Sequence, residues 1–536
     1  MLIKRSLALG AALAAFAGVA VAQFDGPAPV AWRWTQPTQA PPLGSPVIDG
    51  ETVFVAVGQR AYALDKDSGN QKWRFPVGEP IEGYFRAGVL KAGNTLVAAS
   101  DNKAVFGLDA TTGASKWQAL LPVAIIGEPV LVQNTVVMAL ADNSLYALNV
   151  SDGNPVWSAA YKVFDGLYRN LGVHGGNLLV FTSIGELKAI DVTTQKTVWT
   201  ARFSQIGPDA KPVVFGDNVY VVTGPYVAVL NAVTGRGRGQ VDTREQLAFA
   251  PAVTAGGVFV VTREGKALAF DSDLRRPLFP PIDLGSLAAV NPSAIGDMFL
   301  APTTNGALNL IDPKTGSVVW SYLVRPTVSS TGAPTAGAST GGDLAGGNPK
   351  GGATGGGQTK PVPVLAVAAS GPAVLSGSSL FVLVEDGSLL AFDRKNGVDL
   401  TPPDVKLLWP SMGDMVNGQT LELIFKIEDE ASGINTNSLK IDVDGTALDH
   451  EFGRDGIAFC RISSLSKNKP LNNGRKKITV TVTDWMGNLT VKSYSLMVDN
   501  SLRPLQRPTE GTNNPGGRGG GLSGAGSGGG GRSGGG

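Results

Sequence analysis

Residues 61–73 read AYALDKDSGNQKW, and this stretch decides the fold because its pattern recurs along the chain. A short apolar run ends in Asp65, a glycine turn follows at Gly69, and Trp73 stands eight positions after the aspartate. Successive copies lie 40 to 44 residues apart, except for a last interval of 81. A fixed period of about 40 residues with several short strands per repeat is typical of a β-propeller. The acidic or amide residues of the eight copies are Asp65, Asp109, Asn149, Asp191, Asn231, Asp271, Asp312 and Asp393.

Each repeat contains four short segments joined by tight turns, which predicts a four-stranded antiparallel meander. The second segment is apolar at nearly every position, as in residues 53–57, 178–181 and 258–261. A strand that is apolar on both faces must be covered on both sides, and stacked propeller blades provide that cover. The sequence therefore predicts an all-β fold whose main part is an eight-bladed β-propeller.

The aromatic residue of the repeat predicts how neighbouring blades are held together. Burying an indole removes roughly 150–250 Å² from water. That area corresponds to a stabilisation on the order of 4–6 kcal/mol as an upper bound. We expect these rings to act as wedges between blades and not as ligand-stacking groups. They are Trp73, Trp117, Trp157, Trp199, Phe279 and Trp320.

Two repeats depart from this pattern. Gly239 stands at the aromatic position of repeat five, so we expect blade five to be the least well packed. Thr401 stands at that position in repeat eight, while residues 31–34 near the N-terminus read AWRW and look like the missing strand. An N-terminal strand that completes the last blade would close the ring and remove two sheet edges.

The repeat, which reads Ala-Leu-Asp-x-x-x-Gly-x-x-x-Trp at residues 63–73 and is similar at 107–117 and 310–320, resembles the pyrroloquinoline-quinone repeat. That repeat belongs to eight-bladed propellers of the quinoprotein dehydrogenase-like class, and the resemblance covers about residues 30–400. It occurs in cofactor-dependent alcohol dehydrogenases and in non-enzymatic scaffolds. One such scaffold is the propeller lipoprotein of the outer-membrane β-barrel assembly machinery.

The resemblance to the dehydrogenases implies an adjacent cysteine pair and long insertions that build a calcium and quinone site. This chain has one cysteine, Cys460, outside the repeats, and its repeats hold close to 40 residues. We therefore assign no catalytic, cofactor-binding or metal-binding residue and expect no cofactor. The chain also departs from the lipoprotein, because no cysteine follows the leader to accept a lipid.

The remaining segments predict an exported protein with a second domain. Residues 1–22 carry Lys4-Arg5, an apolar stretch and an Ala-x-Ala site, which is typical of a secretory signal peptide. We assign residues 23–400 to the propeller, 327–361 to a disordered insertion, 401–500 to a second domain and 501–536 to a disordered Gly-rich tail. No later stretch is apolar enough to span a membrane.

The second domain resembles the bacterial Ig-like domains of surface and secreted proteins, in residues 401–404, 429–434 and 483–488. We expect an Ig-like β-sandwich there. Asp429 and Asp484 are candidates to share a calcium ion, which binds oxygen ligands. The alternative, which we favour, is that each carboxylate caps its own turn.

The sequence favours a binding function over catalysis. With only His174 and His450, a histidine-based triad or a multi-histidine metal site is hard to build. The net charge of +1 provides no field to attract nucleic acid. We expect a monomeric, non-catalytic scaffold in the periplasm or outside the cell that binds a protein or an envelope polymer. The alternatives are a pyrroloquinoline-quinone-dependent oxidoreductase of degenerate pattern and a carbohydrate-binding or adhesive module.

Overall fold

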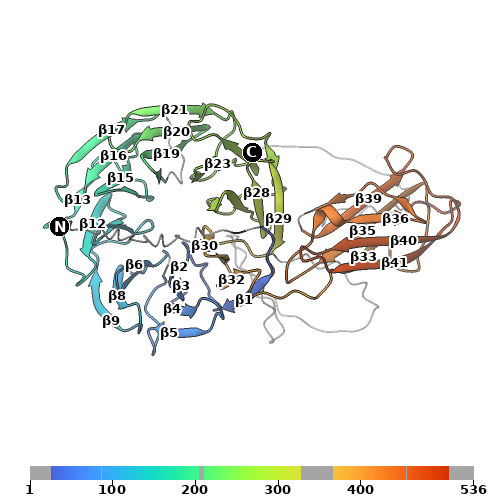
Figure 1. Cartoon of the computed structure of the whole chain (residues 1–536), viewed down its shortest axis with the longest axis horizontal. Coiled ribbons are helices and arrows are strands. Elements are labelled where there is room, and N and C mark those ends of the chain that lie inside the picture. Colours follow the sequence, from blue (N-terminus) through green and yellow to red (C-terminus); the bar gives the residue numbers. More distant parts are fainter. Residues whose placement is uncertain are drawn as a thin grey trace, which may run out of the picture.

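The computed structural model describes residues 24, 26–85, 87–204, 211–326, 366–453 and 455–505. Between residues 30 and 392 the described residues form eight four-stranded antiparallel sheets, one for each repeat. Figure 1 shows these sheets arranged around a ring, with a second body beside one side of the ring. The all-β propeller expected from the repeat is confirmed.

The strands run from the inside of the ring outward within each sheet (Figure 1). Sheets 1 to 4 consist of β2 (Val47–Asp49), β3 (Thr52–Val57), β4 (Arg60–Asp65) and β5 (Gln71–Phe75); β6 (Leu90–Ala92), β7 (Thr95–Ala99), β8 (Ala104–Asp109) and β9 (Ser115–Leu120); β10 (Val130–Val132), β11 (Thr135–Ala139), β12 (Ser144–Asn149) and β13 (Tyr161–Lys162); and β14 (Gly172–His174), β15 (Asn177–Phe181), β16 (Glu186–Asp191) and β17 (Thr197–Arg202). Sheets 5 to 8 consist of β18 (Val213–Phe215), β19 (Asn218–Thr223), β20 (Tyr226–Asn231) and β21 (Gly237–Asp242); β22 (Ala252–Thr254), β23 (Gly257–Val261), β24 (Lys266–Phe270) and β25 (Ile282–Asp283); β26 (Ser293–Ile295), β27 (Met298–Pro302), β28 (Ala307–Asp312) and β29 (Ser317–Leu323); and β30 (Val374–Ser376), β31 (Ser379–Leu383), β32 (Ser388–Phe392) and β1 (Val30–Thr35).

The core of the propeller lies between neighbouring sheets. One apolar cluster joins Phe54 of sheet 1 to Leu96 and Phe106 of sheet 2, and another joins Val53 of sheet 1 to Phe381 of sheet 8. The second strand of each repeat is apolar on both faces because it contributes to two such clusters. The sheets are therefore stabilised mainly by their stacking around the ring.

The N-terminal strand closes the ring, as the sequence predicts. Strand β1 pairs antiparallel with β32, with Trp34 opposite Leu389 and Thr35 opposite Ser388. Trp32 packs with the aromatic and aliphatic residues between sheets 8 and 1, and its Nε1 donates a hydrogen bond to the carbonyl of Lys66 at 2.9 Å. The missing aromatic wedge of repeat eight thus comes from the other end of the propeller.

The fifth sheet, which the sequence predicts to be the least well packed, contains a buried aromatic ring on another strand. Tyr220, on β19, is fully buried in the apolar cluster between sheets 5 and 6. Its hydroxyl donates a hydrogen bond to the carbonyl of Ser272 at 3.1 Å. Ser272 follows the aspartate of its repeat, just as Lys66 follows Asp65. A ring from a different strand therefore fills the place left by Gly239.

Residues 404–498 form two sheets that pack around one shared apolar core, which includes Phe425 and Val480. The strand pairings are antiparallel except for β34 with β41. That this sandwich is Ig-like, and that the domains divide at residues 401 and 501, stay predictions. The sheets are β33 (Asp404–Trp409), β35 (Thr420–Glu428), β39 (Ile457–Ser463) and β38 (Glu451–Phe452); and β34 (Met415–Val416), β41 (Leu489–Val498), β40 (Gly474–Thr483), β36 (Lys440–Val443) and β37 (Thr446–Ala447), with one 3-10 turn, η1 (Thr436–Ser438).

The expected signal peptide, the insertion at 327–361 and residues 506–536 of the tail lie outside the described residues. Within the described part of the chain, no helix has the length and hydropathy needed to cross a membrane.

Candidate functional site

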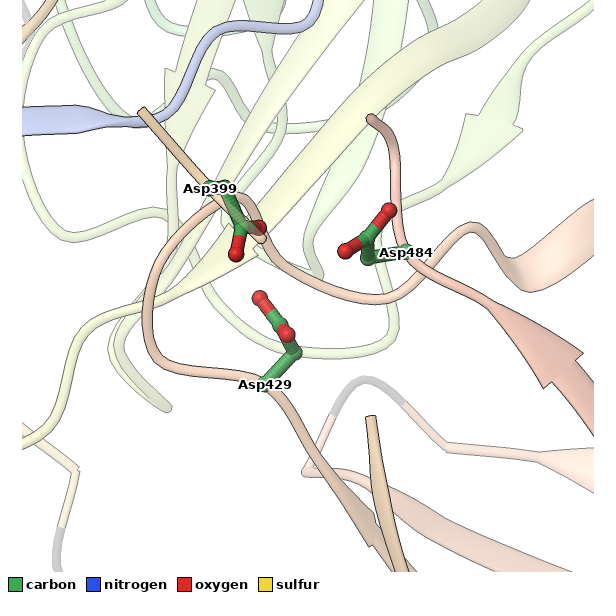
Figure 2. A group of neighbouring side chains, drawn as sticks. All are labelled: Asp399, Asp429 and Asp484. Carbon is green, nitrogen blue, oxygen red and sulfur yellow. The ribbon is translucent and has the colours of Figure 1, made fainter. Parts of the chain in front are cut away.

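Asp429 and Asp484, the two candidates for a shared calcium ion, lie together in the structure, and Asp399 joins them (Figure 2). Their carboxylate oxygens lie within 4.8 Å of one another. Asp399 belongs to the segment between the propeller and the sandwich, Asp429 follows β35, and Asp484 follows β40. All three residues are at least nine-tenths buried. The sequence pointed to two of these residues and missed Asp399, which no spacing links to them.

Hydrogen bonds show that each of these carboxylates caps a turn. Oδ1 of Asp429 accepts the amides of Ala431, Ser432 and Gly433 at 3.2, 2.9 and 2.7 Å. Asp484 accepts the backbone amide of Asn488 at 2.9 Å. A capping role accounts for their types and positions. Oxygen atoms of this kind are also the ligands that hard cations take.

The grouping changes the acidity of Asp429. Burial raises the pKa of this carboxyl to about 6, the negative charges of Asp399 and Asp484 add to the rise, and the amides of Gly433 and Ser432 oppose it. In the described part of the chain none of the three carboxylates takes part in an ion pair. Proton binding by Asp429 is therefore coupled to the folded arrangement of this cluster.

A cavity of about 350 Å³ lies on the ring axis, where the segments that lead into the inner strands converge. Glu128 of the segment before β10 and Lys211 of the segment before β18 form an ion pair across it at 2.9 Å. Arg169 and Asn170 lie beside them. The described residues of this lining include neither histidine nor cysteine. The cavity has room for a small polar molecule.

These lining residues were not predicted from the sequence, although it contains a weak signal for them. The lining position often directly precedes a proline that leads into an inner strand, as in Glu128-Pro129, Lys211-Pro212, Asn291-Pro292 and Gly371-Pro372. The same position in every repeat faces the axis of a propeller. An alignment of the repeats on that proline would have identified these residues as a set.

One face of the ring carries exposed apolar side chains. In an up-and-down sheet, the turn after the second strand and the connection to the next sheet lie at the same end, and we call this end of the ring the loop face. Phe164, between β13 and β14, is 94% exposed, and Ile184, between β15 and β16, is 62% exposed. The two loops touch, because the amide of Ser183 donates to the carbonyl of Asp165 at 3.1 Å. Two exposed apolar side chains on touching loops make the loop face a candidate contact surface.

Charged side chains lie on the same loops and on the strands beside them. Lys188 pairs with Asp165 at 2.9 Å and with Glu186 at 3.2 Å, and Arg202 pairs with Glu186 at 2.9 Å. Apolar anchors with a polar rim are the usual anatomy of a protein-binding surface.

Comparisons with known proteins give the family. The profile of a PQQ-repeat family described as outer membrane protein assembly factor BamB matches residues 27–84, 59–163 and 183–400. The assembly factor BamB of Shewanella oneidensis is 24% identical over 285 residues, which are 48% of this chain and 70% of that protein. A tetrathionate hydrolase of Acidithiobacillus ferrooxidans is 23% identical over 264 residues, which are 43% of this chain and 51% of the hydrolase.

Among solved structures, BamB from Moraxella catarrhalis aligns with a TM-score of 0.49 at 16% identity, covering 68% of this chain and 98% of that one. The expected resemblance to PQQ-repeat propellers is confirmed by the family profile, which matches more than half of the chain. The chain therefore belongs to the family of the outer membrane protein assembly factor BamB.

Proposed function

We propose that this chain is an exported, non-catalytic scaffold that binds a protein of outer-membrane assembly through the loop face of its propeller. Its membership of a family described as an assembly factor supports a binding role. The observation that carries the proposal is Phe164, 94% exposed on a loop that touches the loop of Ile184. Aromatic residues that become fully desolvated in a complex often dominate its binding energy.

The leader-like sequence of residues 1–22 supports export, and in this proposal the folded chain acts in the periplasm or outside the cell. In this proposal the propeller of residues 23–400 provides the binding face. The Ig-like sandwich of residues 401–500 adds a second body at the side of the ring. The partner is a protein in preference to an envelope polymer, because the loop face presents a phenyl ring with a charged rim.

Affinity capture from an envelope extract tests the proposal. We expect the double variant Phe164→Asp/Ile184→Asp to capture about tenfold less of the partner protein than the unaltered chain does, because two apolar anchors are lost. The matched control is Leu465→Asp, since Leu465 is 98% exposed on the sandwich, away from the loop face. Equal capture by the double variant and the control would reject the loop face as the binding surface.

The enzymatic alternative has its own test, which the similarity to a hydrolase makes worth performing. The purified chain is incubated with pyrroloquinoline quinone and calcium, and bound-quinone absorbance and dye reduction are measured. A scaffold shows neither signal. Stoichiometric quinone binding with dye reduction would overturn the non-catalytic proposal, and retention on a polysaccharide column would favour the carbohydrate-binding alternative.

A further inference from the structure

Five of the tryptophan wedges make the same hydrogen bond to the next sheet. In each case the indole Nε1 donates to the carbonyl that follows the acidic or amide residue of the next sheet, at 2.8 to 3.0 Å. This bond satisfies the polar end of a ring that is otherwise buried. The donors and acceptors are Trp32 to Lys66, Trp73 to Ala110, Trp117 to Val150, Trp157 to Val192 and Trp199 to Ala232.

Trp320 of sheet 7 breaks this rule. Its Nε1 donates to the carbonyl of Ser432 in the C-terminal sandwich at 3.3 Å, and not to a carbonyl of sheet 8. Trp320 is 0% exposed, whereas Trp73, Trp117 and Trp157 are each 9% exposed. The sandwich thus adds to the cover of this ring, together with Phe24, whose ring centroid lies 5.9 Å from that of Trp320.

The segment that covers Trp320 has the sequence of a repeat turn. Residues 429–433 read DEASG, and residues 65–69 of repeat one read DKDSG. Gly433 has a φ of +83°, and Gly69 has a φ of +71°. The sandwich therefore presents to the propeller a turn of the same sequence type, with Gly433 against Ser321 and Tyr322 where a repeat glycine would meet a tryptophan ring.

Three consecutive carbonyls of this turn are bound by donors from two different sheets. The hydroxyl of Tyr322 on β29 donates to Glu430 at 2.8 Å, and the amide of Val30 on β1 donates to Ala431 at 2.9 Å. Trp320 binds the third carbonyl, that of Ser432. The turn therefore bridges sheet 7 and the N-terminal strand of sheet 8.

Charged groups reinforce the same bridge. Arg325, two residues after the end of β29, pairs with Glu428 of β35 at 3.0 Å, and both side chains are more than four-fifths buried. Arg33 of β1 donates to the carbonyl of Arg325 at 2.7 Å. In addition, Nε1 of Trp485 in the sandwich donates to the carbonyl of Ser321 at 3.2 Å.

These contacts meet at the joint where the ring has to be closed without a covalent link. Among the strands of the propeller sheets, β1 pairs only with β32. We infer that residues 429–433 act as a clasp that fastens this closing strand, so that the sandwich and the propeller form one rigid unit. The sandwich then stabilises the ring and does not swing freely beside it.

Hydrogen exchange of the full chain tests the clasp. The variant Tyr322→Phe/Glu428→Gln removes the hydroxyl donor to Glu430 and the nearer of the two carboxylates that pair with Arg325, those of Glu428 and Glu430. We expect the amides of β1 to exchange about tenfold faster, because their opening then breaks fewer contacts. The amides of β11, on sheet 3, should keep their exchange rates.

The matched control is Tyr494→Phe/Glu422→Gln, which makes the same chemical changes inside the sandwich. Tyr494 donates to the carbonyl of Val405 at 2.7 Å, and Glu422 pairs with Arg461 at 3.5 Å. If β1 exchanges at the same rate in the clasp variant and the control, the clasp is rejected. An equal acceleration of β1 and β11 would reject it as well. Trp485→Phe, which removes the bond to Ser321 and keeps a smaller aromatic ring against the same apolar cluster, is a milder second variant with the same expected direction.

Discussion

Two turns of nearly the same sequence have opposite electrostatics in this molecule. In the DKDSG turn of residues 65–69, Asp65 accepts the amide and hydroxyl of Ser68 and pairs with Lys72 at 3.3 Å. The hydrogen bond from the Ser68 hydroxyl, together with Lys72, lowers the pKa of Asp65. In the DEASG turn of residues 429–433, burial beside two other carboxylates raises the pKa of Asp429 to about 6.

The difference shows which properties of a turn are local and which are not. In both turns the aspartate accepts backbone amides two and three residues later, and a glycine takes a positive φ. These features follow from residue type and spacing. The neighbouring charges come from elsewhere in the chain: Lys72 is seven residues from Asp65, whereas Asp399 and Asp484 are brought to Asp429 by the fold.

Removal of the rings that the two turns cover has the largest expected effect. Both Trp32→Ala and Trp320→Ala should lower the free energy of unfolding by about 3–5 kcal/mol, as truncation of a buried tryptophan does. Only Trp320→Ala should also speed amide exchange in residues 429–433, because Ser432 loses its donor. Urea unfolding and hydrogen exchange measure the two effects. An unchanged midpoint for Trp32→Ala would contradict ring closure by β1.

Substitution of the turn glycines should separate the two turns further. A Cβ at Gly69 would lie 2.6 Å from the ring of Trp32, whereas one at Gly433 would lie 3.0 Å from the carbonyl oxygen of Ser321. Both positions also carry the backbone strain of a positive φ, about 1–2 kcal/mol for a residue with a side chain. We expect Gly69→Ala to cost about 2–3 kcal/mol and Gly433→Ala about 1–2 kcal/mol. Equal urea midpoints for the two variants would show that the ring contact adds nothing.

Removal of the aspartate charge should change the free energy of unfolding in opposite directions in the two turns. Asp65→Asn loses an exposed ion pair and should destabilise the protein by about 0.5–1 kcal/mol at pH 8. Asp429→Asn keeps an oxygen for the backbone amides and removes one of three clustered charges, so it should stabilise by about 1 kcal/mol. Urea unfolding of both variants at pH 8 decides the sign. Destabilisation by Asp429→Asn would mean that the charged form is required there.

The pH dependence provides the smallest and most specific effect. Because the folded pKa of Asp429 is raised, its protonated form stabilises the fold at acid pH, and this contribution is lost as the pH rises through about 6. Asp65 has the opposite sign, since its contribution is lost as the pH falls through its lowered pKa. The advantage of Asp429→Asn should therefore shrink to nothing near pH 4. If the difference in the free energy of unfolding between Asp429→Asn and the unaltered chain stays constant from pH 4 to pH 8, the raised pKa of Asp429 is contradicted.

Several residues show how far the sequence could be read. Trp32 was recognisable as the missing wedge because the AWRW fragment matches the repeat, and the pairing of β1 with β32 confirms it. Tyr220 could not be predicted as the replacement at Gly239, because it comes from another strand and only the sheet stacking brings it there. Asp399 was missed for the same reason. The residues that line the axial cavity could have been predicted only from an alignment of the repeats at their prolines.

The amino-acid sequence by itself determined the repeat, the four strands in each copy, the turns and the aromatic wedges, because all of these depend on residues within about ten positions of one another. Only the tertiary structure decided what covers Trp320 and what surrounds Asp429. The partners of Trp320 and Tyr322 are 112 and 108 residues away, in a domain that does not share the repeat. No periodicity links positions so far apart, and the three clustered carboxylates come from separate segments that only the fold brings together.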